Sequence, residues 1–172
     1  HLPHASGRMT NPRDIDALLF DFGGVLVQID FQRVCRHWAD AAGVPVTDIA
    51  GRFALGPTYE RHERGEIAIG DYCHALRRDL GIALDDERLV EGWQQVFVDS
   101  IAPTAALLRE LRGRIPMYLF SNTNLTHYDF FRRRYARELE PLERIFTSHE
   151  MGLRKPEREA FLPLIEAKEK EI

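Results

Sequence analysis

The sequence has few cysteines and no long apolar run. Its two cysteines, Cys35 and Cys73, lie far apart and form no Cys-x-x-Cys pair, so their spacing signals neither a zinc site nor a redox pair. We expect two buried, reduced thiols in a cytoplasmic protein. No apolar run approaches the roughly 20 residues that span a bilayer. Residues 1–13 lack the apolar centre of a signal peptide, and we expect them to form a disordered leader.

The sequence also lacks an excess of basic residues. Its net charge is −4 over 172 residues, which gives no general attraction to nucleic acid or to an anionic membrane. The segment Phe130–Tyr135 mixes aromatic and basic residues, but on a helix these fall mainly on different faces, which favours a solvated amphipathic helix. We therefore expect no nucleic-acid or membrane partner, and a monomer or homodimer.

The most informative segment is Ile15–Leu26, in which a short apolar run ends in Asp21 and two glycines follow. The run has strand length and no polar alternation, which is typical of a parallel strand buried on both faces. Ligands of open parallel sheets bind beyond the carboxyl ends of such strands. Asp21 is therefore the best candidate for chemistry, the alternative being a plain turn or cap residue.

Two familiar glycine motifs do not fit this segment. Asp21–Gly23 spells the metal-binding motif of protein kinases, but only 20 residues precede it, which leaves no room for the other kinase loops. Gly23 and Gly24 do not belong to a Gly-x-Gly-x-x-Gly pattern, so a dinucleotide fingerprint is absent.

The remaining chain divides by its periodicity. Residues 30–100 show apolar stripes at helical spacing and predict helices only, with no strand; the helices begin near Asp30, Thr47, Thr58, Asp71 and Asp85. Residues 101–172 alternate between helix and strand, with strands near 115–120 and 144–147 and a final helix from Glu157 after a polar loop, where Pro156 suits the first helical position. This order predicts an α/β fold: a Rossmann-like parallel sheet core from residues 14–29 and 101–172, with an all-helical cap, residues 30–100, inserted in it.

Polar residues at two strand ends and in one loop can meet at one edge of this sheet. Asp21 supplies a carboxylate, Ser121 a hydroxyl with nearby backbone N–H groups, and Lys155 a positive charge. Together they can bind a phosphoryl group and neutralise its charge. Taken singly, Ser121 is explained as a helix cap and Lys155 as a surface charge.

In this order the three residues resemble the motifs of the haloacid dehalogenase superfamily, with Asp21 in the first, Ser121 in the second and Lys155 in the third. The helical block resembles the small cap of the cap-bearing branch. The resemblance covers residues 15 to about 165 and is closer still to bacterial glucose-1-phosphate phosphatases of that superfamily. It includes Asp21–Leu26, His62–Ile67, Gly92–Gln94, Ser121–Asn124 and Arg154–Glu157.

The resemblance implies a Mg²⁺-dependent phosphatase that acts on a small phosphorylated metabolite, in the first place a sugar phosphate. Asp21 would attack phosphorus and form an aspartyl-phosphate, and Lys155 would stabilise both Asp21 and the phosphate. Mg²⁺ would be held by Asp21 and by the backbone carbonyl of Gly23. The residues that would bind the phosphate or the substrate are Ser121, Asn122, Gly24, His62 and Glu63.

The sequence departs from the superfamily at Gly23, where most phosphatases carry a second Asp that serves as general acid and base. His62 and Glu63 of the cap can supply a proton or contact the substrate; the alternative is a salt-bridge cluster at a helix end with Arg61 and Arg64. A non-acidic residue at this position also leaves room for a 2-haloacid dehalogenase, in which Asp21 displaces halide without a metal.

The second departure is the fourth motif of the superfamily, an acidic pair after a further strand. No Asp follows Asp129, and Glu157 and Glu159 are explained by the dipole of a helix start. We expect the last core strand to be missing from a truncated phosphatase, with weaker Mg²⁺ binding and lower stability. The alternatives are a site completed by another subunit and an inactive binding or interaction protein.

Overall fold

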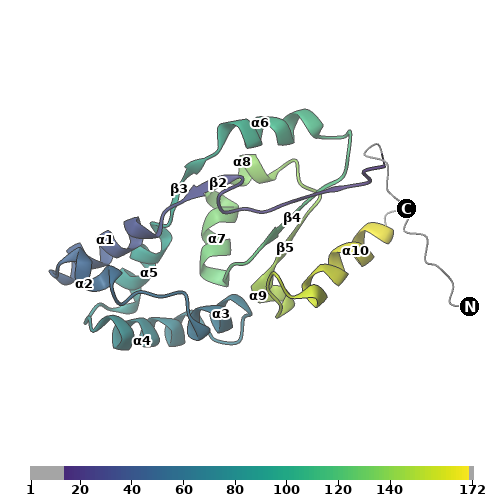
Figure 1. Ribbon diagram of the computed structural model, residues 1–172. Coiled ribbons are helices and arrows are strands. Elements are labelled where there is room, and N and C mark those ends of the chain that lie inside the picture. Colours follow the sequence, from purple (N-terminus) through teal and green to yellow (C-terminus); the bar gives the residue numbers. More distant parts are fainter. Residues whose placement is uncertain (1–13, 171–172) are drawn as a thin grey trace, which may run out of the picture.

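The computed structural model describes residues 14–170, so the expected leader lies outside the described residues. A parallel sheet of three strands in the order β1–β4–β5 forms the core, with Leu18 paired to Met117 and Tyr118 paired to Arg144 (Figure 1). This confirms the α/β class and the parallel sheet. The strands span Leu18–Phe20 (β1), Met117–Ser121 (β4) and Arg144–Thr147 (β5).

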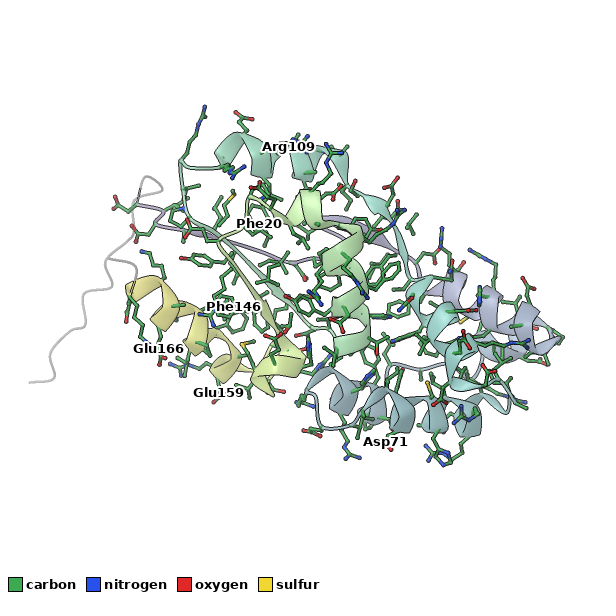
Figure 2. All side chains as sticks on the ribbon, turned by 180° about the vertical axis from the view of Figure 1, so that it is seen from behind. Phe20, Asp71, Arg109, Phe146, Glu159 and Glu166 are labelled. Atoms are coloured by element: carbon green, nitrogen blue, oxygen red, sulfur yellow. The ribbon has the colours of Figure 1, made fainter. Side chains whose placement is uncertain are left out.

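The two faces of the sheet carry different helices because side chains alternate along β4. Met117 and Leu119 join the large core cluster, which includes side chains from α6 and α7. Tyr118 and Phe120 join a smaller cluster under α10, and Figure 2 shows Phe146 on that side. All five residues of β4 are buried, as expected for a central strand covered on both faces. The core helices are Ala102–Leu111 (α6), Leu125–Arg134 (α7), Ala136–Leu139 (α8), Ser148–Met151 (α9), Arg158–Phe161 (η1, a 3₁₀ turn) and Leu162–Glu169 (α10).

The cap contains the expected series of helices. Asp30 caps the first, since its Oδ1 accepts a 2.9 Å hydrogen bond from the backbone N–H of Gln32, and Gly43 ends it at φ 67°. The second helix begins at Val46, next to the expected start near Thr47, and follows Pro45 in extended conformation, so Thr47 does not cap it. The cap helices are Phe31–Ala42 (α1), Val46–Ala50 (α2), Pro57–Glu63 (α3), Ile69–Leu80 (α4) and Asp86–Gln94 (α5).

The cap is not helical throughout, which corrects the expectation of helices only. Strand β3, Phe97–Ser100, pairs antiparallel with β2, Val27–Ile29. The helical spacing of apolar residues from Leu89 to Phe97 wrongly predicts a helix up to Phe97. Beyond α5 the backbone of β2 has groups free to pair, so the chain continues as a strand. The two connections between core and cap thus form one ribbon, visible between α1 and the sheet in Figure 1. The division at residues 30 and 100 stays a prediction, and "cap" denotes residues 30–100 throughout.

The start of the last helix also differs from expectation. Pro156 does not occupy a first helical position: residues 158–161 form a 3₁₀ turn, and α10 begins at Leu162 with Pro163 in its first turn. The preceding polar loop contains α9. Residues 158–161 take the tighter 3₁₀ geometry, in which the Ala160 N–H donates to the Glu157 oxygen at 3.1 Å, so the α-helix begins only after Phe161.

Aromatic packing joins the cap to the core. The ring of Trp93 in α5 lies between Trp38 of α1, at a centroid distance of 6.0 Å, and His127 of α7, at 4.5 Å. The indole Nε1–H of Trp38 donates to the backbone oxygen of Leu89 at 3.0 Å. Cys35 and Cys73 are buried free thiols, as expected. Among the described helices, none has the length and apolarity to cross a membrane.

Candidate active site

Asp21 and Lys155 meet at the carboxyl edge of the sheet. Asp21 follows β1, and its Oδ1 accepts a hydrogen bond from the backbone N–H of Phe22 at 2.7 Å. The Nζ of Lys155 lies 3.0 Å from the same oxygen and donates to the backbone oxygen of Phe120 at 2.7 Å. The side chain of Asp21 is 48% exposed and that of Lys155 23%, so the pair is open to a ligand. The ammonium group is oriented by a carbonyl and faces a carboxylate.

Ser121 and Asn122 continue β4 beside this pair. Both line a small cavity of about 60 Å³ together with Gly23 and with Tyr59 of the cap. The side chain of Asn122 holds the backbone of Lys155: its Nδ2 donates to the Lys155 oxygen at 3.0 Å, and its Oδ1 accepts from the Lys155 N–H at 2.8 Å. Asn122 therefore fixes the loop of residues 152–157, called the lysine loop below. The sequence did not reveal this role.

Gly24 has a structural task. Its φ of +77° is a left-handed conformation that favours glycine, and its N–H donates to the backbone oxygen of Val27 at 2.8 Å. This N–H is therefore already used by the hydrogen bond that closes the turn after Asp21. A contact between the Gly24 N–H and a phosphate would require this bond to break.

A buried serine also holds the two strand ends together. The Oγ of Ser148 accepts from the Thr123 N–H at 2.8 Å and donates to the Thr123 oxygen at 2.9 Å. Ser148 directly follows β5 and Thr123 follows β4, so the link fixes the loops around Ser121. The only sequence signal for it is a small polar residue at the end of each strand.

His62 and Glu63 lie in α3 and are both buried. Glu63 contacts Arg154 of the lysine loop, with Oε1 to Nη2 at 3.0 Å. Burial raises the pKa of the Glu63 carboxyl. The ring of His62 stacks on Tyr72 at 4.6 Å, and burial lowers its pKa to about 4. Glu63 thus lies beside the lysine loop, His62 lines a pocket between the cap and α7, and neither residue lines the cavity at Ser121.

The expected salt-bridge cluster exists in a different form. Arg61 pairs with Glu66 at 3.2 Å within the cap. Arg64 donates from Nε to Oε1 of Glu157 at 2.9 Å and so crosses from the cap to the core. Glu157, expected to stabilise a helix start, is therefore a partner of the cap.

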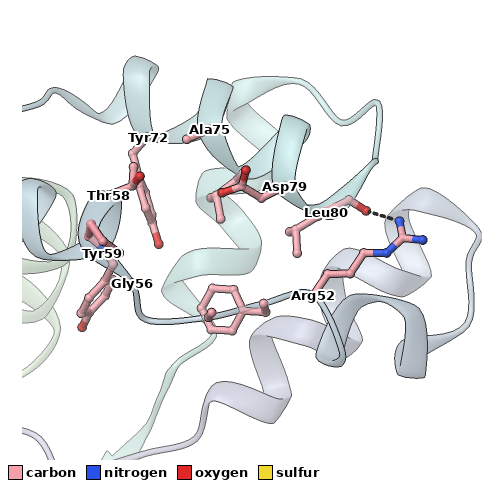
Figure 3. A pocket seen from close by; sticks show the side chains of 12 residues that line it. Arg52, Gly56, Thr58, Tyr59, Tyr72, Ala75, Asp79 and Leu80 are labelled. Atoms are coloured by element: carbon pink, nitrogen blue, oxygen red, sulfur yellow. Dashed lines mark hydrogen bonds between the residues drawn. The ribbon is translucent and has the colours of Figure 1, made fainter.

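The cap contains a pocket of its own, shown in Figure 3, with a volume of about 240 Å³. Arg52 lies at one end, where its Nη1 donates to the Leu80 oxygen at 3.1 Å, and Tyr72 and Tyr59 lie toward the other. Tyr59 borders both this pocket and the cavity at Ser121.

The oxygen atoms at this edge suit a hard cation. Asp21 and the backbone carbonyl of Gly23 are the donor type that Mg²⁺ prefers, and Mg²⁺ is commonly held by one or two carboxylates with substrate phosphates and waters. In residues 14–170 no group of three His, Cys, Asp or Glu side chains could hold a metal. A magnesium ion at this edge would thus need the phosphoryl group and waters for its remaining ligands.

Comparisons with known proteins agree with this geometry. No protein-family model matches the chain. The chain is 30% identical over 154 residues to sesquiterpene phosphatase astK of Aspergillus oryzae, a match that covers 84% of this chain and 70% of that protein. The chain belongs to the haloacid dehalogenase superfamily. It is also 23% identical over 152 residues to D-ribitol-5-phosphate phosphatase of Bacteroides thetaiotaomicron, covering 86% and 74% of the two chains.

Solved structures of the superfamily share the fold. A haloacid dehalogenase family enzyme of Bacteroides thetaiotaomicron, in complex with magnesium and inorganic phosphate, superposes with a TM-score of 0.75 at 27% identity, covering 89% of this chain and 78% of that one. L-2-haloacid dehalogenase of Xanthobacter autotrophicus matches at 18% identity with a TM-score of 0.62, which shows the common fold alone. With two phosphatases among its relatives, this superfamily member is a hydrolase of the phosphatase type.

Proposed function

We propose that this chain hydrolyses a small phosphomonoester, in the first place a sugar or sugar-alcohol phosphate, through an aspartyl-phosphate on Asp21. The observation that carries the proposal is the 3.0 Å contact between Lys155 Nζ and Asp21 Oδ1 at the carboxyl edge of the sheet. A carboxylate that faces an oriented ammonium group can approach a phosphoryl group while the ammonium neutralises the charge of its oxygens.

The carboxylate of Asp21 divides its two oxygens between two tasks. Oδ1 is held by Lys155 and by the Phe22 N–H, which leaves Oδ2 as the nucleophile. Oδ2 forms a bond to phosphorus while the bond to the ester oxygen breaks, and the departing alkoxide takes up a proton from solvent water. Water then attacks the same phosphorus and gives one proton to solvent, the bond to Oδ2 breaks, and hydrogen phosphate leaves with the carboxylate restored.

The neighbouring residues bind and orient the phosphoryl group. Lys155 places its charge between Asp21 and the incoming phosphate, and Asn122 fixes the lysine backbone so that little reorganisation is needed. Ser121 offers its hydroxyl in the same cavity. Asp21 and the Gly23 carbonyl would hold Mg²⁺, which when bound neutralises the phosphoryl oxygens.

The cavity at Ser121 lies next to the Asp21–Lys155 pair, but neither of these two residues lines it. It measures about 60 Å³, and its polar side includes Gly23, Ser121 and Asn122. Tyr59 forms part of its wall from the cap side, so a leaving group that extends from Asp21 toward this cavity would meet the cap at Tyr59. We infer that residues of the cap select the substrate.

The experiment is hydrolysis of p-nitrophenyl phosphate and of a panel with glucose 1-phosphate, ribitol 5-phosphate and a sesquiterpenyl phosphate. Each is measured with Mg²⁺ and with EDTA, beside the Asp21→Asn variant. We expect Mg²⁺-dependent phosphate release that the variant lacks while its circular dichroism is unchanged. Turnover that persists in Asp21→Asn would refute the nucleophile, and EDTA-resistant halide release from 2-chloropropionate would indicate a dehalogenase. A sesquiterpenyl phosphate that exceeds both sugar phosphates in kcat/KM would refute the substrate class.

A further inference from the structure

The lysine loop is attached to one cap helix on both sides of Lys155. Arg154 directly precedes the lysine and reaches Glu63, with Nη2 to Oε1 at 3.0 Å. Glu157 follows two positions later and accepts from Nε of Arg64 at 2.9 Å. Glu63 is the last residue of α3 and Arg64 its C-cap, so two adjacent cap residues hold the loop, with the more exposed Glu60 a further 3.5 Å partner of Arg154.

These contacts are shielded from solvent. The side chain of Glu63 is 2% exposed, and those of Arg154, Arg64 and Glu157 are 20%, 24% and 28% exposed. Ion pairs at this depth are screened less by salt than surface pairs, and loss of one partner leaves a poorly solvated charge. Their geometry is therefore more restrictive than that of an ordinary surface pair.

The core alone holds only part of the loop. Asn122 fixes the backbone N–H and oxygen of Lys155. The Nζ must in addition lie within hydrogen-bond distance of both Asp21 and the Phe120 oxygen. The chain around Lys155 forms a turn in which the Glu157 N–H donates to the Arg154 oxygen at 2.9 Å. What anchors this turn on either side are the side chains of Arg154 and Glu157, whose partners belong to the cap.

We propose that Glu63 and Arg64 are positioning residues for Lys155: their ion pairs with Arg154 and Glu157 hold the lysine loop so that its ammonium group faces Asp21. The inference rests on the proposed function, in which Lys155 stabilises the phosphoryl group. Tyr59, one helical turn before Glu63 in α3, lines the cavity at Ser121, so the helix that holds the lysine loop also borders this cavity.

The test compares Arg64→Gln with Arg61→Gln. Arg61 lies in the same helix, but its ion pair with Glu66 stays within the cap, with side chains 57% and 47% exposed. In Mg²⁺ with p-nitrophenyl phosphate, well below the unfolding temperature, we expect Arg64→Gln to lower kcat about tenfold or more with little change in KM, because a small misplacement of a catalytic group is costly. Arg61→Gln should retain wild-type kcat, and Arg64→Lys, which keeps the charge, should recover most of the loss.

A measurement without turnover separates this inference from the proposed function. Amide hydrogen exchange of residues 152–158 and acetylation of Lys155, both read by mass spectrometry, should be faster in Arg64→Gln than in the wild type and unchanged in Arg61→Gln. Glu63→Gln should show the same increase if it folds. An inactive wild type would refute the proposed function but leave this exchange test in force. The proposal would be overturned if Arg64→Gln left the exchange unchanged, or if it lowered the unfolding temperature but kept the wild-type kcat. Either result would mean that the ion pairs only hold the cap against the core.

Discussion

The Cδ1 atom of Ile29 lies 3.1 Å from the point that a Cβ atom on Gly23 would occupy. Gly23 stands two residues after Asp21, and Ile29 is the last residue of β2. As noted above, most phosphatases of the superfamily carry an Asp at this position. Here an apolar side chain from the ribbon between core and cap borders that space.

This relationship predicts how an acid can be introduced. Gly23→Asp alone should destabilise the fold by about 1–3 kcal/mol because Ile29 must yield. With Ile29→Ala added, Gly23→Asp should raise the rate on an alkyl phosphate at least about tenfold over Gly23→Asn in the same background, because only Asp donates a proton. The ratio of alkyl to p-nitrophenyl phosphate hydrolysis measures this effect. Equal ratios for Asp and Asn would show that proton donation does not limit the reaction.

Removal of the ammonium group of Lys155 should reduce activity with little change in fold. We expect Lys155→Met to lower kcat/KM by about 10²–10³, since one charged group that stabilises the phosphoryl oxygens is lost. Lys168→Met is the matched control, because Lys168 pairs with the exposed Asp16 at 3.3 Å, away from the strand ends. Steady-state kinetics of both variants provides the comparison, and a similar loss in both would argue against a specific role.

The buried histidines predict a loss of stability in acid. Burial lowers the pKa of His127 to about 3 and that of His62 to about 4, from an ordinary value of 6.5. Between the lowered pKa of each histidine and 6.5, the unfolded chain binds more protons than the folded chain. The free energy of unfolding is therefore at its full value above pH 6.5 and decreases as the pH falls, by at most about 1.4 kcal/mol per pH unit for each histidine. Denaturant titrations at pH 7 and pH 5 should show a smaller difference for His127→Gln than for the wild type. The same change at exposed His74 serves as control and should leave the difference as it is.

Contact between cap and core should be sensitive to a single methyl group at Gly65. Gly65 has φ +71°, and a Cβ atom there would collide with the backbone oxygen of His149 in α9. Gly43 has φ +67° with no atom within 4 Å of such a Cβ. Gly43→Ala should therefore cost about 1 kcal/mol for conformation alone, and Gly65→Ala about 2–5 kcal/mol, both measured by chemical denaturation. Equal costs would mean that the approach to His149 relaxes easily.

Local signals in the sequence predicted the elements well. Asp30 and Gly43 bound α1 as capping chemistry requires, and β5 spans residues 144–147, where a strand was predicted. The meeting of Asp21 and Lys155 follows from strand order, because carboxyl ends of parallel strands share one edge.

Contacts between distant segments were beyond such signals. The hold of Asn122 on Lys155 and the pairs that Arg154 and Glu157 form with α3 join residues 33 to 93 positions apart. Along the sequence, Arg154 and Glu157 cannot be told from ordinary surface charges. They gain partners only when the cap packs against the core. Strand β3 was missed for the same reason. Its partner β2 is adjacent in space but is separated from it along the sequence by all of the cap helices.

The stacking of Trp93 between Trp38 and His127 gives the protein a built-in optical probe. The chain has two tryptophans, and both indoles belong to this one stack, which spans cap and core. Because no other indole contributes emission, any loosening of the cap that separates Trp93 from His127 would change the intrinsic fluorescence without a label. Stopped-flow emission on mixing with inorganic phosphate would then time the motion of the cap directly.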